Sequence, residues 1–413
     1  MADRAGQSLA LFFWPGSSTH IGFLWGKIVL KWVGRLVVVL VGLWLAGCVP
    51  GAAGTVEPVQ METAGLTASQ TAGPVIMTPS ATVLPPTAAP STTASPTAGL
   101  TRTPDPLEMF ETRLNRDVQA VAYIEDQCRY LSDRWGEGKA QPGTVVVPVM
   151  YHGVRKDGGT VSDNITVTQE YFEQTMEHAQ KLGFETITSG QLVDFLHHNS
   201  YIPPRSLLLI IDDRRLGTVR AHFLPFLEKN NWTLMMAYIT GVIDQREWNE
   251  IKEVLASGRV EIQAHGFMHN GQTYFTEFTG AEVIHQEIYG PIEAFREQIN
   301  RRPIVFIWPG GNFTPETVKE VRTAGYQLGF TAFARGPVLY NWVPQGEEER
   351  AIQDPLLLLP RYWSTAAYLN LDMAVEIGQQ AADFAAQNRQ KETAWYQRNC
   401  PGYLPLGQNN GEQ

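Results

Sequence analysis

The sequence predicts an α/β fold with a mostly parallel central sheet, arranged as a barrel or as a doubly wound sheet. From about residue 144, apolar runs of strand length alternate with amphipathic segments of helix length. The runs are nearly continuous, as in "SLLLII" at 206–211, which is typical of strands covered on both faces. Polar or aromatic residues follow several of these runs, and parallel α/β folds build their sites at the carboxyl ends of strands.

The expected elements follow one another in regular alternation. The expected strands are mostly apolar runs at 144–154, 206–213, 232–240, 260–266, 303–311 and 326–332. The segments between them have helical periodicity, and several of them begin at Thr or Ser and close at glycine. The expected helices are 168–184, 189–199, 219–231, 247–258, 280–300 and 314–325.

The N-terminal part of the chain has the pattern of an export signal. Residues 1–47 contain basic residues followed by the apolar run 36–47, which is too short for a membrane span of about 20 residues. The run ends in "LAGC", which resembles the lipobox of bacterial lipoproteins, in which the cysteine, here Cys48, becomes lipidated. The resemblance implies a lipid anchor on the outer face of the cell membrane. An uncleaved signal anchor is the alternative, and both place the remainder outside the cytoplasm.

Composition divides the remainder into four segments. Residues 48–106 are rich in Thr, Pro and Ala with few large apolar groups, so we expect a disordered linker. Residues 107–143 should form a helical lead-in, because 107–135 has helical spacing. The α/β domain should then occupy 144–368, followed by a C-terminal helix and tail over 369–413.

Two cysteines, Cys128 and Cys400, bracket the expected folded part. In an oxidising compartment they are candidates for a disulfide that joins its two ends, and two unrelated buried thiols are the alternative. The formal net charge of −10 makes the chain a poor candidate for nucleic-acid binding, because the phosphate backbone requires a basic face.

Three residues near strand ends have the chemistry of a metal site. Asp213 follows a buried strand, and "HGFMH" spaces His265 and His269 four residues apart. One carboxylate with two imidazoles leaves open positions for water and substrate, as a catalytic zinc needs. Each signal is weak alone, because a strand-end aspartate often caps the next helix and a pair of histidines is often structural.

Four motifs in chain order, "VMYHGV", "IIDDR", "HGFMH" and "WPGG", resemble the polysaccharide deacetylase family, also called the NodB-homology domain. The opening Tyr-His is similar to the branch of biofilm poly-N-acetylglucosamine deacetylases. The match covers roughly residues 145–365. It implies a distorted (β/α) barrel that uses a divalent metal, with zinc expected, to remove acetyl groups from an extracellular or cell-wall polysaccharide of the N-acetylglucosamine type.

The resemblance also implies a role for each motif residue. The implied roles are general base for Asp212, metal ligands for Asp213, His265 and His269, general acid for His152, and oxyanion donor through its backbone N–H for Gly310. No histidine follows His285, so a histidine from the C-terminal part of the chain is excluded as the general acid. Arg361 in "LPRYW" resembles a late family arginine that orients the base, and a surface salt bridge is the alternative.

Aromatic residues in the same motifs are candidates for substrate binding. Trp308, Phe267 and Tyr274 have rings that can stack on sugars, and Pro309 lies in the same strand-end loop as Trp308. Packing of these side chains in the barrel mouth is the alternative.

The sequence departs from the family at Arg214, where the family has a glycine. Glycine often marks a positive φ or a close approach to substrate, so an arginine there would strain the backbone, or fill the cleft if it pointed at the metal. This departure keeps a second interpretation open, a catalytically impaired lipoprotein that binds carbohydrate on the same fold. A glycoside hydrolase with two catalytic carboxylates is a third, but it leaves the histidine pair without a role.

Overall fold

The computed structural model describes residues 107–115, 118–156, 158–159, 161, 163–270 and 274–403. The expected signal segment 1–47, the linker 48–106 and Cys48 therefore lie outside the described residues. Among the helices of the described part, none is both long enough and apolar enough to cross a membrane.

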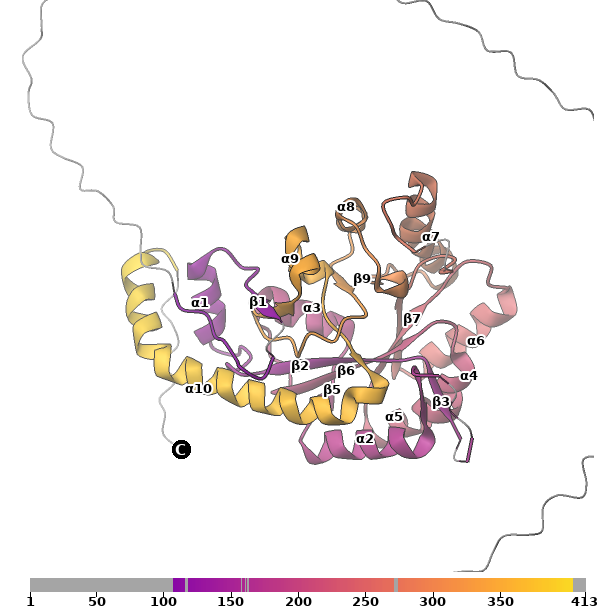
Figure 1. The fold of residues 1–413 in the computed structure, drawn as a ribbon, viewed down its shortest axis with the longest axis horizontal. Coiled ribbons are helices and arrows are strands. Elements are labelled where there is room, and N and C mark those ends of the chain that lie inside the picture. Colours follow the sequence, from indigo (N-terminus) through magenta and orange to yellow (C-terminus); the bar gives the residue numbers. More distant parts are fainter. Residues whose placement is uncertain are drawn as a thin grey trace, which may run out of the picture. The chain divides into compact units, whose positions relative to one another are not determined.

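The core of the fold is a sheet whose described strand pairs are all parallel (Figure 1). The strands follow the order β10-β9-β8-β7-β6-β2-β12, and β5 pairs with β6 outside this path. Their bounds are β2 Val145–Tyr151, β5 Glu185–Thr186, β6 Arg205–Asp212, β7 Leu234–Tyr238, β8 Val260–Ala264, β9 Val305–Ile307, β10 Leu328–Phe330 and β12 Tyr362–Trp363. Parallel pairing brings the carboxyl ends of these strands to one edge of the sheet.

The two ends of this sheet come together, which gives the distorted (β/α) barrel that the sequence predicts. Phe330, the last residue of β10, forms a parallel bridge with Leu359, which lies shortly before β12. The N–H of Leu359 donates to the carbonyl of Gly329 at 2.8 Å, and the N–H of Thr331 donates to the carbonyl of Leu359 at 2.9 Å. Glycine is required at 329, because a Cβ there would lie 2.2 Å from the carbonyl oxygen of Leu357.

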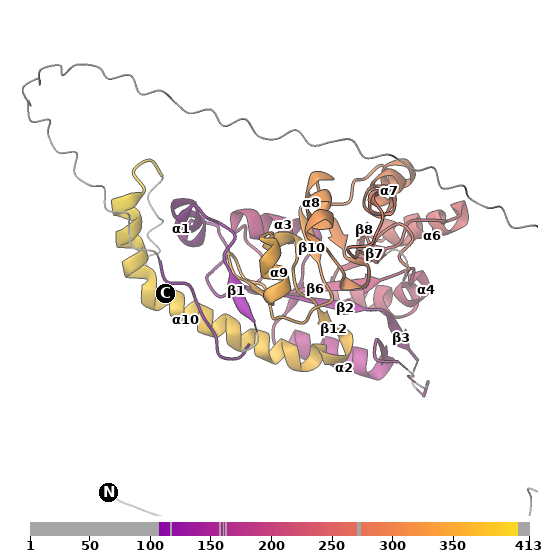
Figure 2. The ribbon, with the colours of Figure 1, turned by 45° about the horizontal axis from the view of Figure 1, so that its top comes forward.

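Helices surround the sheet (Figures 1 and 2), and several start at side-chain caps. Thr168, Thr188, Asp244 and Thr314 each accept a hydrogen bond from a backbone N–H of the first turn. The helical bounds are α2 Gln169–Lys181, α3 Ser189–His198, α4 Leu216–Thr218, η1 Val219–Phe223, α5 Leu224–Asn230, α6 Gln245–Ala256, α7 Ala281–Ile299, η2 Pro309–Gly311, α8 Pro315–Thr323, α9 Glu347–Ile352, η3 Pro355–Leu357 and η4 Ser364–Ala366. The η1 segment is a π-helix, and it comes just before Pro225, which has no N–H for a regular helical hydrogen bond.

The lead-in segment differs from the expectation of a helix over 107–135. Only α1, Gln127–Trp135, is helical, and it starts where the Asp126 carboxylate accepts the N–H groups of the first turn. Upstream, β1 (Gln119–Val121) pairs antiparallel with β11 (Val343–Gln345). The side-chain oxygen of Asn341 accepts the backbone N–H groups of Tyr123 and Ile124, both at 2.8 Å. Hydrogen bonds to β11 and to Asn341, both distant in the sequence, thus hold this segment extended despite its local helical spacing.

The C-terminal helix α10, Ala367–Asn399, runs past α2 to α1 (Figures 1 and 2). Cys400, directly after it, forms a disulfide with Cys128 of α1. The same two helices are also joined by a hydrogen bond, in which the indole N–H of Trp135 donates to the buried carboxylate of Glu392 at 2.7 Å. The lead-in and the C-terminal helix therefore form one covalently linked unit beside the barrel. A further small sheet pairs β3 (Gly153–Arg155) with β4 (Thr166–Thr168).

Candidate metal centre and active site

The carboxyl edge of the barrel brings together three residues that the sequence assigns to a metal. The ligand atoms of Asp213, His265 and His269 all lie within 4.8 Å of one another. Asp213 follows β6, and the two histidines lie on the loop that follows β8. A carboxylate with two imidazoles is a donor set that suits a divalent transition metal such as zinc. The residues present therefore fit the metal that the sequence implies.

His265 is oriented as a metal ligand by its second ring nitrogen. Its Nδ1 lies 3.0 Å from the carbonyl of Ile307, so Nδ1–H donates to that carbonyl and Nε2 keeps its lone pair. Nε2 lies 3.8 Å from Oδ1 of Asp213. Burial lowers the pKa of His265 to about 4, against the opposing effect of the Asp212 charge. The imidazole is therefore neutral near pH 7, which is the form that binds a metal.

Glu287 of α7 holds the histidine loop in place, and the sequence analysis did not identify it. Its carboxylate, which is 1% exposed, accepts the backbone N–H groups of Phe267 and Met268 at 2.8 Å and that of His269 at 3.3 Å. The loop has an unusual backbone, because Gly266 has a φ of +72° and His269 a φ of +40°. A buried carboxylate that binds three N–H groups fixes this conformation.

The positive φ that the family glycine suggests lies at Asp213 rather than at Arg214. Asp213 has a φ of +68°, and Arg214 is not among the residues with positive φ. The Nε–H of Arg214 donates to the carbonyl of Ile239 at 3.0 Å, at the end of β7. Arg214 therefore neither strains the backbone nor carries its charge to the metal centre, which removes the main structural argument for a lost site.

Arg215 is the arginine that contacts the metal centre. Its Nη2 lies 3.2 Å from Oδ2 of Asp213, and its side chain is 43% exposed. Oδ1 of the same carboxylate faces His265. Asp213 thus divides its two oxygens between a surface cation and the position expected for the ion.

Asp212 forms a buried ion pair with Arg361. Nη1 of Arg361 lies 2.7 and 2.9 Å from the two carboxylate oxygens, and both residues are 2% exposed. The Nε–H of Arg361 donates to the carbonyl of Thr331 at 2.8 Å. Burial alone would raise the pKa of Asp212, but the charges of Arg361, His265 and His152 outweigh it and lower the pKa to about 2. The alternative of a surface salt bridge at Arg361 is therefore wrong.

His152 and Gly310 lie at the same edge. Nε2 of His152 is 3.7 Å from Oδ2 of Asp212, and the ring stacks against Trp363, a residue that the sequence analysis did not single out. Gly310 is exposed with a φ of +62°, and a Cβ there would lie 2.9 Å from the ring of Tyr274. The Tyr274 ring in turn meets His269 edge-on, with centroids 5.4 Å apart. Tyr274 therefore borders the metal centre.

The other three candidate substrate-binding residues are occupied in packing. Trp308 is 0% exposed, and its indole N–H donates to the carbonyl of Leu357 at 2.7 Å, so it cannot present a ring to a sugar. Pro309 is buried as well. The ring of Phe267 lies against α7, where a Cβ on Gly290 would come within 2.5 Å of it. Packing, the alternative that the sequence analysis left open, therefore describes Trp308 and Phe267, and Pro309 has no exposed surface to offer a sugar.

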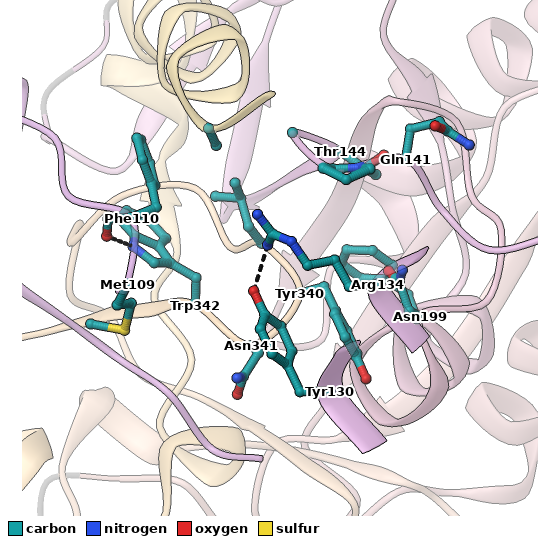
Figure 3. A pocket seen from close by; sticks show the side chains of 15 residues that line it. Met109, Phe110, Tyr130, Arg134, Gln141, Thr144, Asn199, Tyr340, Asn341 and Trp342 are labelled. Atoms are coloured by element: carbon teal, nitrogen blue, oxygen red, sulfur yellow. Dashed lines mark hydrogen bonds between the residues drawn. The ribbon is translucent and has the colours of Figure 1, made fainter. Parts of the chain in front are cut away.

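A separate pocket opens near the amino end of β2 (Figure 3). The aromatic rings of Phe110, Tyr130 and Tyr340 line it, and Arg134 donates a hydrogen bond to the hydroxyl of Tyr130. Thr144, directly before β2, also lines it. Asp213, His265 and His269 do not line this pocket. The pocket lies near the amino end of β2, whereas the candidate metal centre lies at the carboxyl ends of the strands.

Comparison with protein families supports the assignment of these motifs. Residues 200–329 match the family model described as polysaccharide deacetylase. This segment of the chain is similar to polysaccharide deacetylases. The matched segment includes the metal-centre residues, Asp212 and Gly310, whereas His152 and Arg361 lie outside it.

Curated relatives and solved structures of deacetylases are also similar to the chain. Two poly-beta-1,6-N-acetyl-D-glucosamine N-deacetylases, from Escherichia coli O157:H7 and strain K12, are each 22% identical over 234 residues, which is 46% of this chain and 34% of the relative. The chain thus matches about a third of the length of these relatives. Among solved structures, the deacetylase PplD of Streptococcus pyogenes in complex with acetate is 18% identical with a TM-score of 0.46, over 55% of this chain and 97% of that one. IcaB from Ammonifex degensii is 20% identical with a TM-score of 0.44, over 58% and 98%.

Replacing Glu287 should weaken metal binding without removing a ligand. In Glu287→Gln the side-chain amide group would face backbone N–H donors, so the loop that carries the histidines loses its anchor. We expect the affinity for Zn²⁺ to fall by about 10- to 100-fold, as for other residues that orient ligands. Competition with a chromophoric chelator measures this. Glu282→Gln, on the exposed first turn of the same helix, is the control, and equal affinities for the two variants would contradict the role of Glu287.

The two neighbouring arginines should have different effects on metal affinity. In Arg215→Ala the carboxylate of Asp213 loses a competing cation, and the divalent ion loses a repelling charge. We expect Zn²⁺ to bind about 3- to 10-fold more tightly, a modest change because the pair is solvent-screened. Arg214→Ala should leave the affinity unchanged, because its side chain points to Ile239. A change in the Arg214 variant alone would show that the described orientation of the two arginines is wrong.

Proposed function

We propose that this chain hydrolyses N-acetyl groups of a polysaccharide of the N-acetylglucosamine type with the help of a divalent metal, for which zinc is expected. One observation carries the proposal, the position of a buried, ionised carboxylate, Asp212, directly beside the ligand set of Asp213, His265 and His269. The family match over 200–329 and the deacetylase names of the relatives support the same reaction class.

Each residue of the site would have a different role in amide hydrolysis. When bound to Asp213, His265 and His269, the metal would polarise the amide carbonyl and make water more acidic. Asp212 would accept the proton of the attacking water, because it stays ionised over the whole physiological pH range. His152 would donate a proton to the nitrogen of the leaving amine as the C–N bond breaks. The products are acetate and the free amine of the sugar.

Gly310 would supply the remaining contact. Its exposed backbone lies beside Tyr274 and the metal centre, and its backbone N–H is a candidate donor to the developing oxyanion. A side chain at 310 would collide with the ring of Tyr274, which is a reason for glycine here independent of its positive φ. Tyr274 is the remaining candidate to contact a sugar ring.

Activity and metal content together test the proposed function. The purified protein should bind close to one metal per chain and release acetate from poly-N-acetylglucosamine oligomers. Asp213→Ala should lose both, whereas Asp212→Asn should keep the metal and release acetate about 10²- to 10⁴-fold more slowly, because only the base is removed. Metal bound without acetate release would favour the impaired carbohydrate-binding alternative. New reducing ends without acetate would favour a glycoside hydrolase.

We also propose that the chain is exported and anchored by a lipid on Cys48. The disulfide between Cys128 and Cys400 supports an oxidising compartment, where such bonds persist. The motif "LAGC" supports lipidation at that cysteine.

Metabolic labelling with an alkyne-tagged fatty acid tests the anchor. The wild-type chain should carry the label, and Cys48→Ala should lose it, because the lipid acceptor is gone. Cys128→Ser, a cysteine in the folded part, should stay labelled and serves as the control. An unlabelled wild-type chain in the membrane fraction would point to the uncleaved signal anchor instead.

A further inference from the structure

Among the described residues, none forms a hydrogen bond that would orient the ring of His152, the proposed general acid. Its Nδ1 is buried and has no hydrogen-bond partner within the described part of the chain. Its Nε2 lies 3.7 Å from the Asp212 carboxylate, beyond ordinary hydrogen-bond length. An imidazole that must deliver a proton to one atom needs a defined orientation, so something other than a hydrogen bond must supply it.

Trp363 makes the contact that can orient the ring. The indole and the imidazole lie nearly parallel, at 15°, with centroids 5.7 Å apart. Trp363 is the last residue of β12, and β12 pairs with β2 so that Trp363 lies opposite Met150, two residues before His152. Strand pairing therefore fixes the indole beside the imidazole.

The segment that enters β12 also holds the proposed general base, Asp212. Arg361, immediately before β12, binds Asp212, and Trp363 follows two residues later. Residues two apart in an extended segment point to the same face, so both side chains face the active-site edge. We infer that Trp363 is a positioning residue for His152, and that the segment 361–363 orients the general acid through its indole and the general base through its guanidinium. This inference rests on the proposed deacetylase function.

Two substrates with different leaving groups separate this role from a general structural one. Hydrolysis of an N-acetyl amide requires protonation of the leaving nitrogen, whereas an aryl acetate such as 4-methylumbelliferyl acetate expels a stable phenolate that needs no proton. Loss of the acid should therefore slow amide hydrolysis and spare aryl-ester hydrolysis. Loss of the base or of the metal should slow both.

The experiment compares Trp363→Leu, Trp363→Phe, His152→Ala and Asp212→Asn on both substrates, with metal content measured for each. We expect Trp363→Leu to lower kcat for acetate release from N-acetylglucosamine oligomers by about 10- to 100-fold with little change in KM, because the acid is misplaced rather than removed. Its aryl-ester turnover and metal content should match those of the wild type. Trp363→Phe should recover most of the amide activity, since it restores an aromatic face.

Each other outcome has a distinct meaning. Equal losses on both substrates in Trp363→Leu, or a rise in KM alone, would overturn the positioning role in favour of a structural or sugar-binding one. Full amide activity in Trp363→Leu would overturn it as well. A wild-type protein that binds metal and cleaves neither substrate would overturn the proposed function, and this inference with it.

Discussion

The buried ion pair between Asp212 and Arg361 is the interaction on which the active-site edge depends. An ionised carboxylate inside a barrel is stable only if an opposite charge meets it, and removing one partner of such a pair typically costs about 3–5 kcal/mol. Arg361 meets that need and also donates to the carbonyl of Thr331 after β10. One guanidinium therefore ties together β6, the end of β10 and the segment that enters β12. The same arginine therefore connects the two ends of the sheet and keeps the proposed base ionised.

Two adjacent aspartates have opposite surroundings because the backbone turns between them. Asp212 is the last residue of β6 and points into the interior, whereas Asp213 has a left-handed conformation and lies partly exposed beside the histidines. The interior aspartate is neutralised by a permanent cation, and the outer one retains an oxygen that faces His265. The conformation of Asp213 thus separates the proposed proton acceptor from the proposed metal ligand, although the two residues are consecutive. Arg215 moderates the charge of the outer carboxylate at the protein surface.

The sequence predicts the strands, most helices and the candidate ligand set, because these follow from local periodicity and from residue chemistry at strand ends. It misses features that depend on contacts far along the chain. The segment before α1 is extended because β11 and Asn341 take its hydrogen bonds, and Trp308 is buried because Leu357 accepts its indole N–H. Glu287 left one signal, a carboxylate four residues before the buried Pro291 on the same face of α7, but periodicity alone does not say which N–H groups it binds. The stacking of Trp363 depends on strand pairing, which composition does not reveal.

The disulfide between Cys128 and Cys400 spans 272 positions and encloses every strand of the barrel. A protease that cuts a surface loop anywhere inside this span therefore releases no fragment, because the two pieces stay covalently joined. The nicked halves also stay at a high effective concentration, which favours their continued association. The folded domain thus gains a tolerance to single proteolytic cuts, and this tolerance disappears wherever the surroundings become reducing.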